Sequence, residues 1–195
     1  LAGAGAGKLL LCDRDRVDAS NLQRQILYTQ SDVGRPKTDA ARERLAALNK
    51  DVVLETLGPA GIEAAVKNAD VVLDCTDNFP SRFALNALCV KARKPLVSGA
   101  AIRFEGQLAV FDLRQPGSPC YACLYATHGD AQETCEEAGI LGPVAGVIGS
   151  AQALAALQLL LGIGEDAGRL RVWNARTMEW KSLTIPLDPQ CKEHS

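Results

Sequence analysis

The sequence has few aromatic residues, a net charge close to zero and no long apolar run. Aromatic residues make up 5% of its 195 residues and hydrophobic residues 47%, so the core must consist mainly of Leu, Val, Ile and Ala, as in parallel sheets covered by helices. A formal net charge of −2 gives no overall attraction to nucleic acid or to membranes. No uninterrupted apolar run reaches the roughly 20 residues that span a bilayer, and no signal peptide starts the sequence.

Histidine is scarce and the cysteines do not form an even set. His128 and His194 are the only histidines, and no Ser-His-Asp set is visible. Seven cysteines is an odd count, and several lie inside apolar runs. This usage indicates a reducing compartment with metal-binding or catalytic cysteines, and not a disulfide framework. We therefore expect a cytoplasmic protein.

Strand and helix patterns alternate along the chain, which predicts an α/β fold. The sheet should be Rossmann-like, doubly wound and mainly parallel, with an antiparallel extension at its C-terminal end. The long segment Gln115–Gly142 has no period and is rich in Gly, Pro and Cys, so we expect a functional loop there. The predicted strands are Leu9–Cys12, Val52–Thr56, Val71–Cys75, Pro95–Ala101, Gln107–Phe111, Leu170–Asn174 and Trp180–Ile185, and the predicted helices are Lys37–Leu48, Ile62–Asn68, Phe79–Ala92 and Val144–Leu161.

The glycine-rich start, Leu1–Lys8, imitates a phosphate-binding loop. Such a loop must follow a strand and open a helix, whereas these glycines precede the strand Leu9–Cys12. They are better interpreted as the end of a helix and its turn. Residues 1–195 are thus expected to form a single nucleotide-binding domain from which the glycine loop is missing, because Asp13 has too few residues before it.

The stretch from Asp13 to Lys37 has the side chains of a nucleotide site. An acid that closes a strand can bind ribose hydroxyls, and the groups that follow it, Asn21, Arg24 and Lys37, can bind phosphate. A solvated charged loop is the alternative. Asp77-Asn78 follows the strand Val71–Cys75, where ligands bind in open α/β sheets. Asp77 could hold Mg²⁺, or either residue could cap the next helix.

Two pairs of residues with metal-ligand spacing lie near the C-terminal end. Cys120-x-x-Cys123 sits in a loop flanked by Pro and Gly, where a redox dithiol is not expected. Cys191-x-x-His194 could complete a tetrahedral Zn²⁺ site, which would be structural because four protein ligands leave no open position. The alternative is a tail in which His194 binds nothing. In the same loop as Cys123, Glu136 and Glu137 would raise the pKa of the Cys135 thiol and so weaken it as a nucleophile.

Several motifs, taken in order, resemble the MoeB/ThiF adenylyltransferases, which are relatives of ubiquitin-activating enzymes. They cover nearly the whole chain: Asp13-x-Asp15, Ser20-Asn21-Leu22-Gln23-Arg24-Gln25, Gly34-x-Pro36-Lys37, Asp74-Cys75-Thr76-Asp77-Asn78, Ser98-Gly99-Ala100-Ala101, Cys120-x-x-Cys123 and Gly146-Val147-Ile148-Gly149. The resemblance implies catalytic roles for Arg24, Lys37 and Asp77. It implies ATP binding by Asp13, Ser20, Asn21, Leu22, Gln23, Arg24, Lys37, Asp77 and Asn78, and a thioester or persulfide role for Cys135 in some members. The family's C-terminal Cys-x-x-Cys is replaced here by Cys191-x-x-His194.

The activity that the resemblance implies is ATP-dependent adenylylation of a small ubiquitin-like sulfur carrier protein. Ser98–Gln107 resembles the molybdopterin-synthase activators, whereas Leu1–Gly5 and Gln25–Thr29 lean toward the thiamin type; the balance favours molybdopterin. A general sulfur-carrier activator, a non-catalytic scaffold of the same fold and an NAD-dependent oxidoreductase are the alternatives. The helix Val144–Leu161 is apolar on nearly all faces, so it should be buried all round, between the sheet and a homodimer interface.

Overall fold

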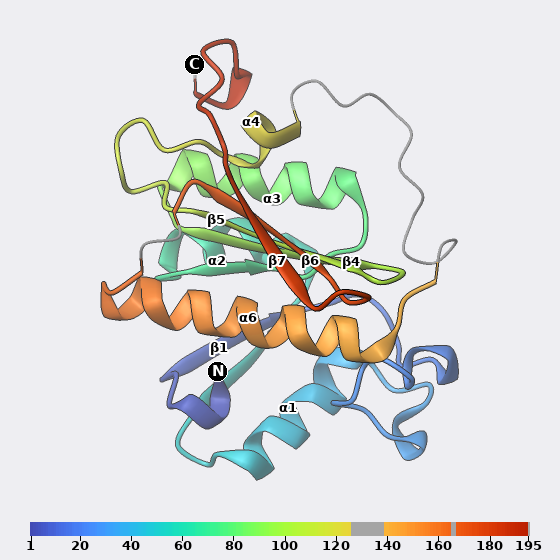
Figure 1. Cartoon of the computed structure of the whole chain (residues 1–195). Coiled ribbons are helices and arrows are strands. Elements are labelled where there is room, and N and C mark those ends of the chain that lie inside the picture. Colours follow the sequence, from blue (N-terminus) through green and yellow to red (C-terminus); the bar gives the residue numbers. More distant parts are fainter. Residues whose placement is uncertain (126–138, 165–166, 195) are drawn as a thin grey trace. The chain divides into compact units, whose positions relative to one another are not determined.

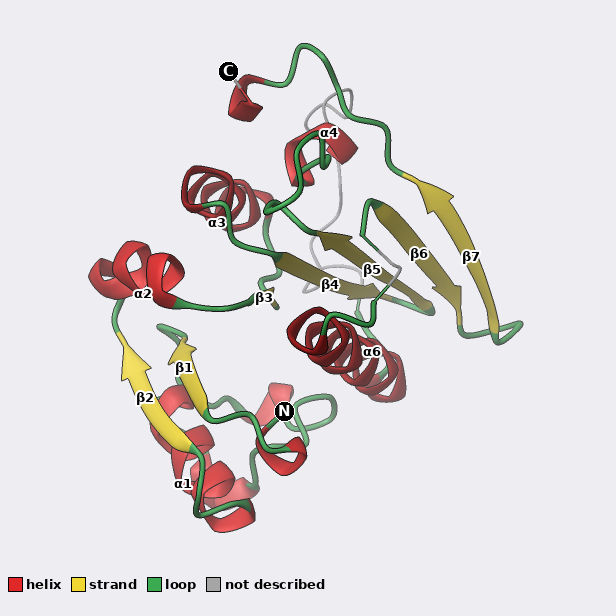
Figure 2. Cartoon of the chain, turned by 90° about the vertical axis from the view of Figure 1, so that its left-hand side faces the viewer, coloured by secondary structure: helices red, strands yellow, loops and turns green. Residues whose placement is uncertain are grey.

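The computed structural model describes residues 1–125, 139–164 and 167–194. The chain divides into two compact units, Leu1–Ala65 and Val66–Ser195. Both appear in Figures 1 and 2, and each is described by itself below.

The first unit is a parallel pair of strands with one long helix. Leu10 in β1 lies opposite Glu55 in β2. Before β1, a short 3-10 turn ends at Gly5, whose φ of 86° lies in the left-handed region that glycine favours. The glycine-rich start therefore ends a helical turn, as the sequence predicts. The elements of this unit are β1 (Lys8–Cys12), α1 (Lys37–Leu48), β2 (Val53–Leu57) and 3-10 turns at Ala2–Ala4, Ala19–Asn21, Gln30–Asp32 and Pro59–Gly61.

The second unit is a five-stranded mixed sheet in the order β3-β4-β5-β6-β7. The β3–β4 pair is parallel, and the remaining pairs are antiparallel. The helix α2 (Ile62–Asn68) starts before the boundary between the units and ends after it. The other elements are β3 (Val72–Asp74), α3 (Phe79–Ala92), β4 (Leu96–Ile102), β5 (Glu105–Phe111), α4 (Tyr121–Tyr125), α6 (Gly142–Leu161), β6 (Arg169–Asn174), β7 (Glu179–Thr184) and a 3-10 turn at Lys192–His194.

Helices cover both faces of this sheet. Figure 2 shows α3 and α4 on one face and α6 on the other. The helix α6 packs closely on β4 and β5, and Val144 and Ile148 form a buried cluster with Trp173. This close packing of α6 on β5 requires glycine at position 106, because a Cβ atom there would lie only 2.3 Å from Ile148 Cγ1. The mixed α/β fold with parallel pairing and an antiparallel C-terminal extension is confirmed.

Gln152 anchors α6 to the ends of two strands. Its buried amide nitrogen donates hydrogen bonds to the carbonyl oxygens of Asp74, at 2.7 Å, and Val97, at 2.8 Å. Its amide oxygen accepts a hydrogen bond of 3.4 Å from the Cys75 thiol. The side chain fits because position 99 is glycine: a Cβ atom there would lie 2.6 Å from the Gln152 amide oxygen.

The length and composition of α6 would also allow it to cross a bilayer. The core helix of a folded domain passes the same test, however, and α6 packs on the sheet through a buried polar residue, Gln152. We therefore assign α6 to the core of the second unit. The helix is not buried all round within one chain, because Leu154 is 57% exposed and Leu161 is 69% exposed.

The helix α4 is a correction to the expected loop between Gln115 and Gly142. Aromatic contacts stabilise this five-residue helix. The ring of Tyr121 packs edge-on against Phe83, and that of Tyr125 packs edge-on against Phe79. These partners come from α3, so the sequence of the segment itself contains no pattern that predicts the helix.

Candidate nucleotide and metal sites

The segment that follows β1 is fixed against the segment that precedes α1. The Val17 amide donates to the Arg35 carbonyl at 2.9 Å, and the Gly34 amide donates to the Val17 carbonyl at 2.8 Å. The Lys37 amide donates to the Asp15 carbonyl at 3.0 Å. Two predicted motifs that lie about twenty residues apart in the sequence are thereby brought into register.

Lys37 is the buried cation of this region. Its side chain is only 9% exposed, and its Nζ lies 3.2 Å from Asp15 Oδ2 and 3.9 Å from Asp13 Oδ2. The two carboxylates are more open, with side chains 39% exposed at Asp13 and 59% at Asp15. The structure thus brings Asp13 and Lys37 together as predicted, and adds Asp15, for which the sequence predicted no role. An ammonium group beside two accessible carboxylates can exchange one of them for a phosphate oxygen.

The segment Ser20–Gln25 consists of tight turns, and the first of them is capped by Asp18. The Asp18 carboxylate accepts a hydrogen bond of 2.8 Å from the Ser20 amide, and hydrogen bonding to Ser20 lowers the pKa of Asp18. Arg24 Nη1 donates to the Ser20 carbonyl at 3.2 Å, and the side-chain nitrogen Nδ2 of Asn21 donates to the Ser20 hydroxyl at 3.3 Å. Leu22 ends the 3-10 turn Ala19–Asn21. The side chains of Arg24 and Asn21 are therefore both held against Ser20.

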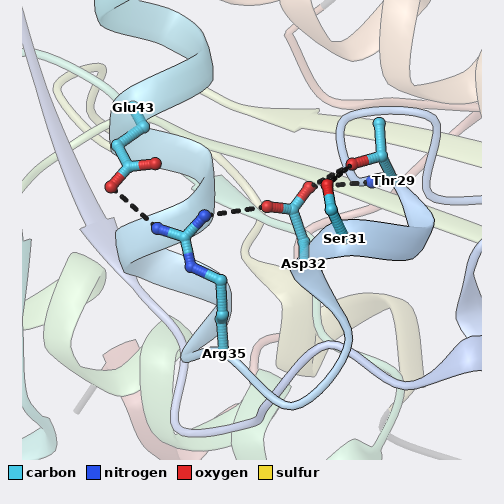
Figure 3. A network of polar contacts seen from close by, with 5 residues as sticks. All are labelled: Thr29, Ser31, Asp32, Arg35 and Glu43. Carbon is cyan, nitrogen blue, oxygen red and sulfur yellow. Dashed lines mark hydrogen bonds and ion pairs between the residues drawn. The ribbon is translucent and has the colours of Figure 1, made fainter.

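A polar network holds the turn that leads into Lys37 (Figure 3). Asp32 accepts hydrogen bonds from the amide and the hydroxyl of Thr29, at 2.9 and 2.8 Å, and these bonds lower the pKa of its carboxyl. Arg35 bridges Asp32, at 2.9 Å, and Glu43 on α1, at 2.7 Å. Sequence reasoning missed this network, although Thr29-x-x-Asp32 is a capping-box pattern that could have indicated it.

Asp77 lies on the turn between β3 and α3. The cap of α3 is Asn78, whose side-chain oxygen accepts a hydrogen bond of 2.9 Å from the Ser81 amide. Asp77 is exposed, and its carboxylate accepts a hydrogen bond of 3.1 Å from the Asn78 amide group. Of the two capping candidates, the structure therefore selects Asn78 and leaves Asp77 open to a ligand.

The predicted nucleotide residues are divided between the two units. Asp13, Arg24 and Lys37 belong to the first unit, and Asp77 and Asn78 belong to the second. Convergence of Asp77 with Arg24 on one pocket therefore stays a prediction. Cys135 lies outside the described residues, so its proposed role also stays a prediction.

Cys120, Cys123, Cys191 and His194 form one cluster, as the sequence predicts. Their ligand atoms all lie within 4.8 Å of one another. Cys120 Sγ is 3.8 Å from Cys123 Sγ and 3.7 Å from Cys191 Sγ. Zinc–sulfur bonds of about 2.3 Å in a tetrahedron separate the sulfur atoms by about 3.8 Å, so these residues fit a zinc ion.

Asn86 supports this cluster from α3, a contact that sequence reasoning missed. The side chain is fully buried, and its nitrogen donates to Cys120 Sγ at 3.5 Å. Its oxygen accepts a hydrogen bond of 2.9 Å from the Tyr121 amide. Burial raises the pKa of the Cys120 thiol. The N–H···S contact orients the sulfur and would favour its thiolate form.

One protein family and several curated proteins match nearly the whole chain in sequence. The sequence profile of the ThiF family matches residues 1–193. The sulfur carrier protein ThiS adenylyltransferase of Escherichia coli K12 is 45% identical over 95% of this chain and 75% of its own length. The molybdopterin-synthase adenylyltransferase of the same organism is 44% identical over 98% of this chain and 79% of its own length.

Solved structures support the fold alone, because their sequence identity is low. The Microcin C7 biosynthetic enzyme MccB, in complex with N-formylated MccA, superposes with a TM-score of 0.82 at 19% identity. The match covers 100% of this chain and 62% of the MccB chain, so this chain spans less than two thirds of that structure.

Proposed function

Because the chain belongs to the ThiF family, we infer that it is an adenylyltransferase that activates a small ubiquitin-like sulfur carrier protein with ATP. The observation that carries this inference is the 44–45% identity, over nearly the whole chain, to two enzymes named for that activity. We treat the two units as parts of one nucleotide-binding domain, because the family match runs without a break across their boundary.

The reaction requires an oxygen of the carrier's C-terminal carboxylate to bond to the α-phosphorus of ATP while the bond to pyrophosphate breaks. A carboxylate is already ionised at neutral pH, so no general base is needed. The task of the protein is to bring two anions together and neutralise their charge. The buried Lys37 and the cationic side chain of Arg24 suit that task.

Lys37 and Arg24 neutralise and orient the phosphates, with Asn21 and the backbone of Ser20–Gln23 beside them. Asp13 binds the ribose hydroxyls. Before the nucleotide arrives, Asp15 provides the carboxylate closest to Lys37, at 3.2 Å, and keeps the ammonium group directed at the strand end. A phosphate oxygen then replaces Asp15 as the partner of Lys37.

Asp77 is the residue that would hold Mg²⁺, which supplies positive charge beside the phosphates. A hard carboxylate oxygen is the ligand type that Mg²⁺ prefers. The exposed position of Asp77 supports this role, since Asn78 and not Asp77 caps the helix. Asn78 fixes the direction of the Asp77 carboxylate through its amide group.

Zinc has a structural role in this proposal. Cys120, Cys123, Cys191 and His194 would hold it, and the sulfur–sulfur distances support a tetrahedral site. With all four positions filled by protein, the ion would join α4 to the C-terminal tail and would take no part in the reaction.

We propose a homodimer formed through α6 in a cytoplasmic enzyme. The apolar side chains that α6 leaves open, Leu154 and Leu161 among them, support an interface there. A covalent link from the carrier to Cys135 is an additional proposal that follows from the family resemblance alone.

ATP–pyrophosphate exchange tests the proposed function. The full-length gene product is incubated with radiolabelled pyrophosphate and ATP, and separately with a molybdopterin-type carrier and a thiamin-type carrier. Carrier-dependent label in ATP supports the adenylyltransferase, and the carrier that gives it identifies the substrate. A folded protein that exchanges label with neither carrier would instead support the non-catalytic scaffold.

A further inference from the structure

Arg82 is a buried cation beneath the turn that carries Asp77. It extends from the first turns of α3, is only 8% exposed, and its Nη2 donates a hydrogen bond of 2.5 Å to the Thr76 carbonyl. Burial alone would lower its pKa, but neighbouring Tyr121 and Asp74 outweigh that effect, so the pKa of Arg82 is raised. The guanidinium group therefore stays charged.

Asp74 also binds Thr76, through its side chain. This carboxylate is 1% exposed, and its Oδ1 accepts hydrogen bonds from the Thr76 amide at 2.9 Å and the Thr76 hydroxyl at 2.7 Å. Its Oδ2 accepts a hydrogen bond of 3.0 Å from Ser98 on the neighbouring strand β4. Asp74 is thus tied to the sheet while Arg82 is tied to the helix.

Thr76 is consequently held at its amide, its hydroxyl and its carbonyl. On the other side of Asp77, Asn78 caps α3 through its side chain and accepts a hydrogen bond from the Arg82 amide at 3.3 Å through its carbonyl. Both neighbours of Asp77 are therefore fixed, while its carboxylate stays exposed. This is the arrangement expected of a preorganised metal-binding carboxylate.

We propose that Arg82 is a positioning residue for Asp77: its guanidinium fixes the Thr76 carbonyl so that the Asp77 carboxylate is presented to Mg²⁺ in one direction. The inference rests on the proposed function, in which Asp77 holds that ion. A purely structural arginine would stabilise the unit without affecting how the enzyme depends on Mg²⁺.

The test uses Arg82→Met, which keeps an apolar stem and removes every donor, and Arg82→Lys, which keeps the charge on a single donor nitrogen. Cys89→Ala is the matched control, because Cys89 is buried on the same helix and makes no hydrogen bond to Thr76, Asp77 or Asn78. All variants are assayed for ATP–pyrophosphate exchange in the full-length protein over a Mg²⁺ titration at saturating carrier.

The expected result is a selective change in the Mg²⁺ dependence. Arg82→Met should raise the Mg²⁺ concentration for half-maximal exchange by about 10- to 100-fold, as removal of an outer-shell partner does elsewhere. Arg82→Lys should recover part of the loss. Cys89→Ala should match the wild type in Mg²⁺ dependence, even where its melting temperature falls.

A double variant links the effect to Asp77. Asp77→Ala alone should show weak exchange with a raised Mg²⁺ requirement, and adding Arg82→Met should raise that requirement no further. Additive shifts would overturn the proposal, as would a folded Arg82→Met protein with the Mg²⁺ dependence of the Cys89→Ala control. A wild type without exchange would overturn the proposed function itself, which separates the two failures.

Discussion

Lys37 combines deep burial with two carboxylate neighbours, a combination that ordinary surface lysines lack. The ammonium group is already desolvated, so a phosphate oxygen that reaches it gains a strong interaction without removing much water. The carboxylates of Asp13 and Asp15 are exposed to solvent, so under the proposed function a nucleotide would reach Lys37 past them.

Lys37→Ala should therefore lower kcat for pyrophosphate exchange by about 100- to 1000-fold, the usual effect of deleting one preorganised donor. The measurement is initial exchange rate at saturating ATP and carrier. Lys50→Ala, at an exposed position after α1, is the control and should exchange at the wild-type rate. An active Lys37→Ala enzyme would remove Lys37 from the catalytic residues.

Asp32 gives a second prediction at the scale of one residue. Its pKa is lowered below the ordinary 3.8, first by the hydrogen bond from the Thr29 amide. A lowered pKa means that Asp32 stabilises the fold at neutral pH and loses that contribution as pH falls through its folded-state pKa. Asp32→Asn should thus lower the melting temperature at pH 7, and the difference from wild type should shrink below pH about 4.

Thermal melts of both proteins from pH 7 to pH 3 check this. Asp51→Asn provides the comparison, because Asp51 is exposed and lies outside the network of Figure 3. A gap between wild type and Asp32→Asn that stays constant across the pH range would argue against the hydrogen-bonded carboxylate as its cause.

At the scale of elements, the packing of α6 on the sheet requires glycine at the strand positions that face it. Gly106→Ala places a methyl group against Ile148, so it should destabilise the protein by about 1–3 kcal/mol, the range for overpacked cores. Gly58→Ala, at an ordinary φ of −81° with open space around it, is the control and should be neutral or slightly stabilising. Urea unfolding measures both, and Gly106→Ala should cost less in an Ile148→Ala background than in the wild type, because the opposing side chain is then gone.

The open face of α6 yields a prediction about assembly. Leu154→Glu places a charge at a position that is 57% exposed in one chain, so it should shift a dimer to a monomer without lowering the stability of that chain. Leu48→Glu, on α1 and 67% exposed, is the matched substitution. Sedimentation at micromolar concentration distinguishes them, and a wild type that is already monomeric would rule out the α6 interface.

For the whole molecule, the cysteine–histidine cluster is a long-range connection, since Cys120 and Cys191 lie 71 residues apart. A clip of that span removes about 4 kcal/mol of unfolded-chain entropy by analogy with cross-links. Elemental analysis should find one zinc per chain in the wild type. Cys120→Ser should lose it and melt earlier, whereas His194→Ala should retain part, because water can take the fourth position. Folded, zinc-free wild type prepared without chelators would contradict the site.

The sequence predicted the helices better than the contacts between them. The bounds of α1, α2 and α3 agree with prediction, because apolar spacing and local caps such as Asn78 are written in the segments themselves. The cluster around Cys120 was also predictable, since ligand spacing is local. The contact between Arg82 and Thr76, by contrast, depends on how the end of β3 packs against the start of α3, and no local sequence pattern predicts that packing.

The fit between Gly99 and Gln152 restricts how this protein can diverge. A side chain at position 99 would displace the amide that binds the carbonyls of Asp74 and Val97. A shorter residue at position 152 would leave both carbonyls without that donor. A side chain at position 99 should therefore be tolerated better once residue 152 has been shortened, so descendants of this sequence should change position 99 only together with position 152.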